Sequence, residues 1–365
     1  MKAVVVKIGS NIITSNEGLN SRRIGAIARA AYAVSEMGYS VALVSSGAIA
    51  AGRRKLRIRG KRPDIRLKQA AAAVGQSSLI RQYEKKFAQY GRMVAQILIT
   101  QDAFDDRRRY INARNTILSL FSFGIIPVIN ENDTVAVDEI KFGDNDRLAS
   151  LIAGMLGAER LFMLSDVDGL YTDDPKKNKN AELIRAVDDV NDDIMNMAKI
   201  SSSSAGTGGM YSKILSAEHA AEHGVTVNII SGKLPGRMVS VLQGKHYGTV
   251  IRAKEKKISS RKGWIAFGIK SKGSIVLDKG AVEALAKKGK SLLPSGITGV
   301  KGDFKTGDAV YCIDMEGNRI AKGLTNYSSD EIRKIRGRKT SEIEKHLGYR
   351  YSDEVIHRDN LVRIK

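Results

Sequence analysis

Two polar stretches, INENDT at residues 129–134 and FGDNDR at residues 142–147, point to the fold class of this chain. An apolar run over 124–129 leads into the first stretch, and an alanine-rich apolar segment over 148–156 follows the second. This order predicts a loop between a buried strand and a helix, and open α/β sheets bind ligands at the carboxyl ends of their strands. The alternative is ordinary turn chemistry with an aspartate capping the next helix.

Buried strands and helices alternate on both sides of these stretches. The apolar runs lie at residues 3–8, 41–44, 93–99, 125–129, 160–164 and 225–230. The run at 3–8 is continuously apolar except for Lys7, which is typical of a strand covered on both faces, as in a parallel sheet. Segments with helical spacing separate the apolar runs, so the sequence predicts βαβ units and a mainly parallel sheet.

Several strands run into turns that suit an anion. Lys7 lies near the end of the first strand, SSGAIAAG at 45–52 opens a helix, and a glycine-rich segment at 201–210 precedes a helix with Lys213 in its first turn. Backbone N–H groups at a helix N-terminus favour phosphate or carboxylate. A lysine that reaches the sheet edge, an ordinary βα turn and a flexible linker stay open as alternatives. The Walker pattern Gly-x-x-x-x-Gly-Lys-Ser/Thr is absent from the chain.

The chain is strongly basic, with a formal net charge of +21. Residues 252–365 hold 26 Lys and Arg against 14 Asp and Glu, so the last third is the most basic part per residue. The positive electrostatic potential of such a charge favours anionic substrates or polyanions. An ordinary solvated surface explains the excess of basic residues equally well. Residues 53–68 alone contain nine Lys or Arg. We interpret this segment as an exposed, solvated loop, with nucleic-acid contact as the weaker alternative.

Length and cysteine content limit the organisation of the chain. At 365 residues the chain exceeds the usual size of a single core, which predicts two domains. We place a catalytic domain at 1–251, a basic linker at 252–268, and at 269–365 a small domain whose short strands and glycine turns indicate a barrel. A single cysteine, Cys312, excludes an intrachain disulfide. The lack of a bilayer-length apolar run or signal-peptide layout predicts a cytoplasmic protein.

Blocks spread over nearly the whole chain resemble the glutamate 5-kinase (gamma-glutamyl kinase) family, in order and in spacing. The catalytic blocks are VKIGS at 6–10, SSGAIAAG at 45–52, NEND at 130–133, GDND at 143–146, SDVDGLY at 165–171 and GTGGM at 206–210. The final part is similar to a PUA domain through SLLPSG at 291–296, GDF at 302–304, LTNYSS at 324–329 and HRDNL at 357–361. The resemblance implies the amino acid kinase fold, a three-layer αβα sandwich with a mainly parallel central sheet, followed by a small β-barrel-like PUA domain.

The resemblance also implies an activity. Members of this family transfer the γ-phosphoryl group of ATP to the side-chain carboxylate of L-glutamate, which is the first step of proline biosynthesis, with Mg²⁺ carried mainly by the ATP phosphates. It suggests a homo-oligomer, a dimer or a tetramer, and feedback inhibition by proline. RNA contact by the PUA domain stays open. The alternatives are a kinase of the same fold that acts on acetylglutamate, aspartate, carbamate or a nucleoside monophosphate, and an RNA-binding PUA protein.

The matching positions of the family carry over residue by residue. Lys7 and Lys213 are assigned to the phosphoryl oxygens and Asp146 to the acid that orients them. Gly9 and Gly47 would supply backbone N–H donors. The residues assigned to glutamate are Asp133 for its ammonium group and Ser46 and Asn145 for its carboxyl groups. Those assigned to the nucleotide are Ser165, Asp166, Thr207, Gly208, Gly209 and Met210, and Asp144 is a candidate for the outer shell of Mg²⁺.

Overall fold

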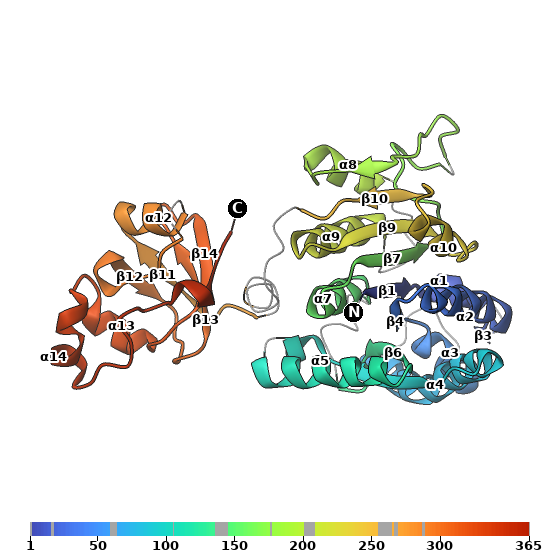
Figure 1. The fold of residues 1–365 in the computed structure, drawn as a ribbon, viewed down its shortest axis with the longest axis horizontal. Coiled ribbons are helices and arrows are strands. Elements are labelled where there is room, and N and C mark those ends of the chain that lie inside the picture. Colours follow the sequence, from blue (N-terminus) through green and yellow to red (C-terminus); the bar gives the residue numbers. More distant parts are fainter. Residues whose placement is uncertain are drawn as a thin grey trace. The chain divides into compact units, whose positions relative to one another are not determined.

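The computed structural model describes residues 2–15, 18–58, 64–104, 106–135, 145–175, 177–200, 209–254, 265, 269–286 and 289–364. Three predicted site residues, Asp144, Thr207 and Gly208, lie outside these ranges, as does most of the predicted linker at 252–268. The chain divides into two compact units, Met1–Lys257 and Ile258–Lys365 (Figure 1). No helix in the described ranges combines the length and the apolar character needed to cross a bilayer.

The N-terminal unit is built on an eight-stranded sheet in the order β5-β6-β4-β1-β7-β9-β10-β8. In that order the strands are Val94–Ile99, Ile126–Glu131, Ser40–Ser45, Ala3–Ile8, Arg160–Ser165, Thr226–Ser231, Thr249–Ile251 and Ala186–Val187. Every pairing from β5 to β9 is parallel, and β10 runs antiparallel to β9. The predicted mainly parallel sheet is therefore confirmed. A two-stranded hairpin, β2 (Thr14–Ser15) and β3 (Gly18–Leu19), lies outside the sheet.

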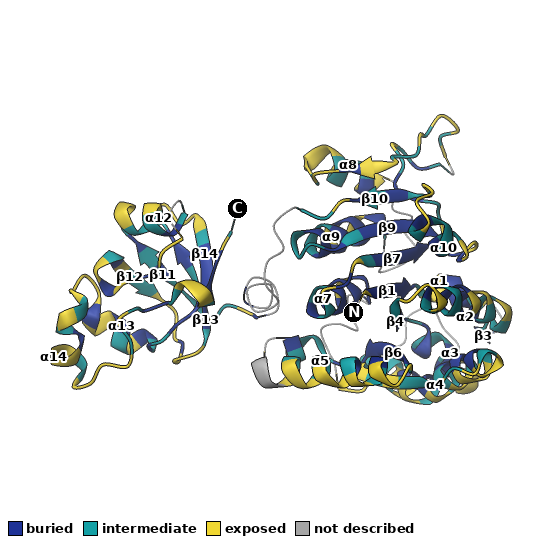
Figure 2. Cartoon of the chain, in the orientation of Figure 1, coloured by how far each residue is buried: buried dark blue, intermediate teal, exposed yellow. Residues whose placement is uncertain are grey.

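Helices cover both faces of this sheet (Figure 1). One face carries α5 (Arg107–Ser122), α7 (Asn145–Leu156), α8 (Asp192–Ile200) and α9 (Met210–Glu222). The other carries α2 (Ser21–Glu36), α4 (Ile65–Phe87) and α10 (Arg237–Leu242), together with the shorter α1 (Ser10–Ile13) and α3 (Ala48–Lys55). In Figure 2 the central strands β6, β4, β1, β7 and β9 are buried, whereas the outer sides of α4 and α5 are exposed. The unit is thus the expected three-layer αβα sandwich.

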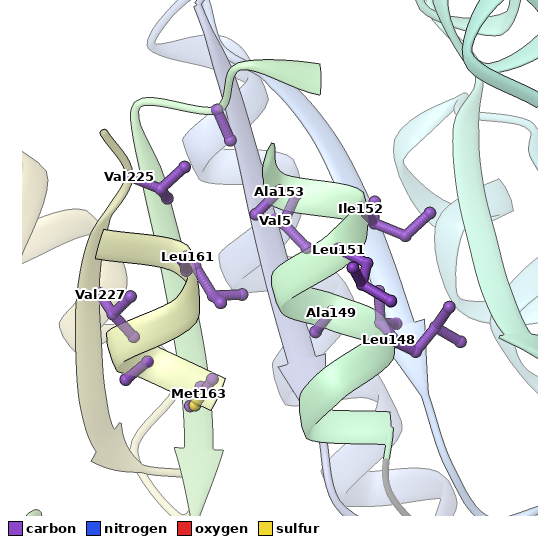
Figure 3. Packing of buried hydrophobic residues seen from close by; sticks show 14 of the residues in the cluster. Val5, Leu148, Ala149, Leu151, Ile152, Ala153, Leu161, Met163, Val225 and Val227 are labelled. Atoms are coloured by element: carbon purple, nitrogen blue, oxygen red, sulfur yellow. The ribbon is translucent and has the colours of Figure 1, made fainter. Parts of the chain in front are cut away.

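The alternation of side chains along β1 decides which residues meet which helix layer. Val4 and Val6 pack into the core under α2 and α4, whereas Val5 packs into the core under α7 and α9. Figure 3 shows Val5 of β1 next to Ala153 of α7. Since successive strand residues point to opposite faces, Lys7 shares the α7–α9 face with Val5.

The carboxyl ends of the central strands meet at one edge of the sheet. Strands β1 and β7 are neighbours, with Ile8 paired to Leu164. The chain continues from β1 to β4 on one side of this pair and from β7 toward β9 on the other side. This is a topological switch point, where open α/β sheets bind ligands. The turns that follow β1, β4, β6 and β7 all open onto this edge.

Helices α3 and α4 approach each other as closely as two backbones can. A Cβ atom at Gly52 would lie 1.7 Å from the carbonyl oxygen of Ala71, and one at Gly75 would lie 1.8 Å from the carbonyl oxygen of Ala48. Only glycine leaves room for such contacts. The contact brings α4 against the start of α3, directly after the turn that leaves β4.

The prediction that residues 53–68 form an exposed loop is wrong at both ends. Helix α3 continues to Lys55, and α4 begins at Ile65 with the carboxylate of Asp64 accepting the backbone N–H of Leu67 at 2.8 Å. The basic residues at the end of α3 are favoured there, because cations stabilise the negative end of the helix dipole. Residues 59–63, in the middle of this segment, lie outside the described residues.

The C-terminal unit contains a five-stranded sheet in the order β12-β11-β13-β14-β15. These strands are Ile297–Lys301, Gly273–Leu277, Ala309–Ile313, Arg319–Leu324 and Leu361–Arg363, and the helices are α12 (Lys279–Ala286), α13 (Ser329–Ile335) and α14 (Ile343–Leu347). The unit has its own hydrophobic core, which includes Cys312 and Ile332. A small, strand-rich C-terminal domain is therefore confirmed. The sequence analysis missed α13, whose start is marked by a capping box between Ser328 and Glu331.

Candidate active site

Three buried charged residues from three elements meet at the carboxyl edge of the sheet. The Nζ atom of Lys7 lies 2.5 Å from Oδ1 of Asp146, and the Nζ atom of Lys213 lies 3.4 Å from Oδ2 of the same carboxylate. Lys7, Asp146 and Lys213 are 5%, 0% and 7% exposed. The structure thus brings together two lysines that are more than two hundred residues apart along the chain, and one carboxylate holds both.

The local sequence explains how these side chains meet. Lys7 points to the α7–α9 face because of its position in β1, and a Cβ atom at Gly9 would lie 3.8 Å from its Nζ atom. Asp146 lies in the first turn of α7 and Lys213 in the first turn of α9, and these helices pack side by side on that face. The sequence analysis placed Asn145 and Asp146 in a loop, whereas the structure starts α7 at Asn145.

The electrostatics of this centre are dominated by burial and by mutual pairing. Burial disfavours the charged form of Asp146, but the ammonium groups of Lys7 and Lys213 outweigh it and hold the pKa of this carboxyl below its ordinary value of 3.8. Burial lowers the pKa of Lys213 below its ordinary value of 10.5, an effect that Asp146 opposes and Lys7 reinforces. The carboxylate of Asp146 therefore forms ion pairs with both buried lysines.

The three side chains carry one more positive charge than negative. Buried charges are costly unless they are paired, so two buried lysines at the end of a sheet favour the approach of an anionic group. Phosphate oxygens are such a group, and lysines commonly bind them as point charges. Ser212 adds to the arrangement, because its hydroxyl lies 3.2 Å from Oδ2 of Asp146 and 3.0 Å from the carbonyl oxygen of Gly209.

A chain of polar side chains runs from this centre to helix α4. The Nδ2 amide of Asn145 donates to Oγ of Ser46 at 2.8 Å and to Oδ1 of Asn130 at 2.9 Å. The Nδ2 amide of Asn130 in turn donates to Oε1 of Gln76 at 3.0 Å. These four side chains, Ser46, Asn145, Asn130 and Gln76, are called the amide chain below. The amide chain starts next to Asp146 and brings together three elements and the turn after β4.

The turn after β4 requires a glycine. Gly47 has φ 109°, in the left-handed region, and a Cβ atom there would lie 3.0 Å from Cδ1 of Ile13. It directly precedes α3, so the backbone N–H groups of the turn and of the first helical residues are without helical partners. Gly9 precedes α1 with ordinary extended backbone angles. Both glycines therefore precede a helix on the ligand edge, which the sequence indicated for Gly47 and not for Gly9.

The residues assigned to the nucleotide lie along the next part of the edge. Ser165 is buried at the end of β7, and its hydroxyl lies 3.3 Å from Oδ1 of the exposed Asp166. The charge of Asp166 acts to raise the pKa of Lys213, although the net shift is downward. Gly209 and the buried Met210 begin α9. Asp133, assigned to the ammonium group of glutamate, is half-buried in the turn after β6.

The sequence analysis did not assign Gln76, Asn130 or Ser212 to the site. A signal for Gln76 was present, because the buried positions of α4 recur at helical spacing and Gln76 is the polar member of that stripe. Asn130 and Glu131 were interpreted as loop residues, but β6 extends through them and both are buried. Buried polar residues at the end of a strand have to find partners in the fold, and only the structure identifies these partners.

The described residues include no group of three or more His, Cys, Asp and Glu side chains arranged to hold a metal ion. The donors of the described part of the site do not form a cage for Mg²⁺. Asp144, the predicted outer-shell partner of Mg²⁺, lies outside the described ranges.

The comparisons with known proteins agree with this fold. The model of the amino acid kinase family matches residues 2–231 and that of the PUA domain matches residues 273–347. The chain belongs to the amino acid kinase family. The carbamate kinase from Giardia lamblia bound to AMP-PNP shares the fold, with a TM-score of 0.52 and 17% sequence identity over 69% of this chain and 99% of that chain.

Curated relatives that match over the full length of the chain are glutamate 5-kinases. A glutamate 5-kinase from Syntrophotalea carbinolica is 47% identical and covers 99% of this chain and 97% of its own length. Glutamate 5-kinases from Syntrophus aciditrophicus and Myxococcus xanthus are 46% and 45% identical, over 100% and 99% of this chain and 95% and 96% of their own lengths. The similarity therefore includes both units.

Proposed function

We propose that this protein is a glutamate 5-kinase that transfers the γ-phosphoryl group of ATP to the side-chain carboxylate of L-glutamate, giving L-glutamyl 5-phosphate and ADP, the first step of proline biosynthesis. One observation carries the proposal on the structural side, namely the two buried lysines held by Asp146 at the switch point of the sheet. The full-length similarity to glutamate 5-kinases supports the choice of substrate.

Transfer of the phosphoryl group requires that the reacting atoms are aligned and that the negative charge of the phosphates is neutralised. A carboxylate oxygen of glutamate attacks the γ-phosphorus, a new P–O bond forms, and the bond between that phosphorus and the β–γ bridging oxygen breaks, so that the electron pair leaves with ADP. Because the carboxylate is already ionised at neutral pH, the step requires no general base. The main barriers are repulsion between anions and alignment of the reacting atoms.

The lysines are placed to lower that repulsion. Asp146 holds the ammonium groups of Lys7 and Lys213 against its two carboxylate oxygens, so both cations are fixed before the substrate binds. Charges that are already fixed stabilise a transition state without having to reorganise during the reaction. The N–H groups of the turns at Gly9 and Gly47 would add donors to the phosphoryl oxygens. Lys7 and Lys213 are thus the proposed catalytic residues, and Asp146 positions them.

Glutamate binding is assigned to the part of the edge beside this centre. Asp133 is the proposed partner of the ammonium group, and Ser46 the proposed donor to a carboxyl group. The nucleotide is assigned to the edge at Ser165 and Asp166 and to the start of α9 at Gly209 and Met210. Mg²⁺ is carried by the phosphates of ATP and supplies further neutralisation of their charge.

The test is an assay of ADP release by the purified full-length protein with ATP and Mg²⁺, with and without L-glutamate. Hydroxylamine in a parallel reaction traps the acyl phosphate as a hydroxamate. We expect glutamate-dependent ADP release and a matching yield of hydroxamate. Higher kcat/KM with N-acetylglutamate, aspartate, carbamate or a nucleoside monophosphate, or ADP release that ignores glutamate, would overturn the proposal.

A further inference from the structure

Gln76 is a buried polar residue of helix α4 that the mechanism does not use. Its side chain is 8% exposed, and within the described residues its Nε2 atom has no hydrogen-bond partner. Leaving a buried amide donor without a partner is costly, so such a residue needs an explanation. Its carbonyl oxygen, by contrast, accepts the Nδ2 amide of Asn130 at 3.0 Å.

The hydrogen bonds of the amide chain all run in one direction. Because Oε1 of Gln76 takes a donor from Asn130, the amide of Asn130 has to present its oxygen to Asn145. Asn145 then uses both of its amide hydrogens, one toward Asn130 and one toward Oγ of Ser46. A side-chain amide has two donor hydrogens, so Asn145 has none left.

The direction of these hydrogen bonds decides which donor and acceptor atoms of Asn145 and Ser46 are left for a substrate. The atom that Asn145 has left is Oδ1, an acceptor, which suits an ammonium group. Since Ser46 accepts from Asn145, its hydroxyl hydrogen is left to donate, which suits a carboxylate. In this direction the remaining acceptor of Asn145 suits the ammonium group of glutamate and not the carboxyl group assigned to it from the sequence, whereas the hydroxyl of Ser46 suits a carboxyl group.

We propose that Gln76 is a positioning residue that sets the direction of the amide chain, so that Asn145 presents an acceptor to the ammonium group of an α-amino acid and Ser46 presents a donor to its carboxylate. This inference rests on the proposed function and names the side chains that bind the α-ammonium and α-carboxylate groups of the substrate. The close approach of Gly75 to the backbone of Ala48 holds this part of α4 against the start of α3, which follows the turn that carries Ser46. Without the oxygen of Gln76, the amide of Asn130 is free to rotate by half a turn.

The experiment compares Gln76→Met with wild type in steady-state kinetics for both substrates. Methionine is similar in size and shape but accepts no comparable hydrogen bond. We expect the KM for L-glutamate to rise about 10- to 100-fold, because a buried hydrogen bond is lost and a buried donor is left unsatisfied, while the KM for ATP changes by less than about twofold. Thermal unfolding shows whether the variant keeps its fold.

Three further arms separate positioning from a structural role. Gln76→Glu keeps an oxygen toward Asn130 and should stay within about threefold of wild type for glutamate. Gln82→Met changes another glutamine of α4, half-buried and outside the amide chain, and should leave both KM values unchanged. Glutarate lacks the ammonium group, so the preference of the enzyme for L-glutamate over glutarate, as a ratio of kcat/KM, should shrink in Gln76→Met.

The outcomes distinguish this inference from the proposed function. The assay of the wild-type protein, with ATP and with or without L-glutamate, tests the proposed function. The ratio of the glutamate KM of Gln76→Met to that of wild type tests the role of Gln76. A glutamate KM within twofold of wild type in Gln76→Met would overturn the inference. So would an unchanged preference over glutarate, equal effects of Gln76→Met and Gln82→Met, or a parallel loss of kcat, both affinities and thermal stability.

Discussion

At the scale of single residues, the site is organised by one fully buried carboxylate. Asp146 has no exposed surface and is paired with both lysines, so its charge is needed to keep two buried cations in the fold. Removing one partner of a buried ion pair leaves an uncompensated charge, which is far more costly than losing a pair at the surface. The same residue therefore stabilises the fold and, in the proposed mechanism, positions the lysines.

Lys213→Met should separate these two contributions. The variant removes one buried cation and keeps the pair between Lys7 and Asp146, so the protein should fold. We expect kcat to fall about 10²- to 10³-fold, as when a preorganised donor to a transition state is lost, with a much smaller change in the KM for glutamate. Steady-state kinetics measures both. Lys245→Met, at an exposed lysine, is the matched control, and an unchanged kcat in Lys213→Met would remove this residue from the mechanism.

The pH dependence of activity follows from the lowered pKa of Lys213. Burial is its main cause, and Asp146 opposes it. The ammonium form is lost as pH rises through the lowered pKa, so kcat should decline at a pH below the ordinary lysine value of 10.5. Between the folded and unfolded pKa values the unfolded chain binds more protons, so the contribution of Lys213 to stability rises with pH in that same window.

Asp146→Asn tests this assignment, because it removes the charge that holds the pKa of Lys213 up. The alkaline decline of the residual activity should then move to lower pH than in wild type. The measurement is the pH profile of kcat for both proteins, with unfolding followed at each pH. A decline at the same pH in both proteins would mean that a group not coupled to Asp146 is responsible.

At the scale of elements, the close contact between α3 and α4 connects the fold to the site. The glycines at positions 52 and 75 let the two backbones touch, and the next residue along α4 is Gln76 of the amide chain. A residue with a side chain at either position has to push the helices apart. Any such shift also moves Gln76 away from Asn130.

Gly75→Ala should therefore destabilise the N-terminal unit and weaken glutamate binding together. Overpacking of this kind typically costs about 1–3 kcal/mol, which for a unit of this size lowers Tm by about 2–12 °C. Gly236→Ala is the matched control, since nothing lies within 4 Å of a Cβ atom there and φ is −59°, so its Tm should be unchanged or slightly higher. Scanning calorimetry measures both, and equal Tm values for the two variants would contradict the argument.

The sequence predicted the elements of the catalytic unit well and their ends less well. Continuous apolar runs identified the central strands, because burial on both faces leaves a direct pattern in the residues. The ends of β6 and α7 were misplaced, since Asn130, Glu131 and Asn145 look like turn residues and are instead ordered by partners far away in the chain. The meeting of Lys7 with Lys213 rested on family resemblance, and the role of Gln76 depends on a hydrogen bond that no local pattern reveals.

At the scale of the whole molecule, the two units have separate cores. The residues that pack around the eight-stranded sheet and those that pack around the five-stranded sheet form distinct clusters. Every described residue of the candidate site belongs to the unit Met1–Lys257. Loss of packing in the C-terminal core should therefore leave the chemistry intact, provided that the catalytic unit stays folded.

Cys312 makes this separation measurable, because it is the single cysteine of the chain and lies fully buried in the C-terminal core. Burial raises the pKa of its thiol to about 12, so the native protein should react very slowly with a thiol reagent. Ile332→Ala removes a fully buried side chain from the same core, which typically costs about 2–5 kcal/mol.

If labelling of Cys312 requires opening of this core, Ile332→Ala should speed it by about 30- to 4,000-fold, since each 1.4 kcal/mol changes the open population about tenfold. Over the same period kcat should stay within about twofold of wild type, because no described site residue lies in this unit. Met315→Ala, at a side chain that is 73% exposed, should change neither quantity. A kcat that falls as the labelling rate rises would show that the catalytic unit depends on the C-terminal core. The expectation that the two units are functionally independent would then be wrong.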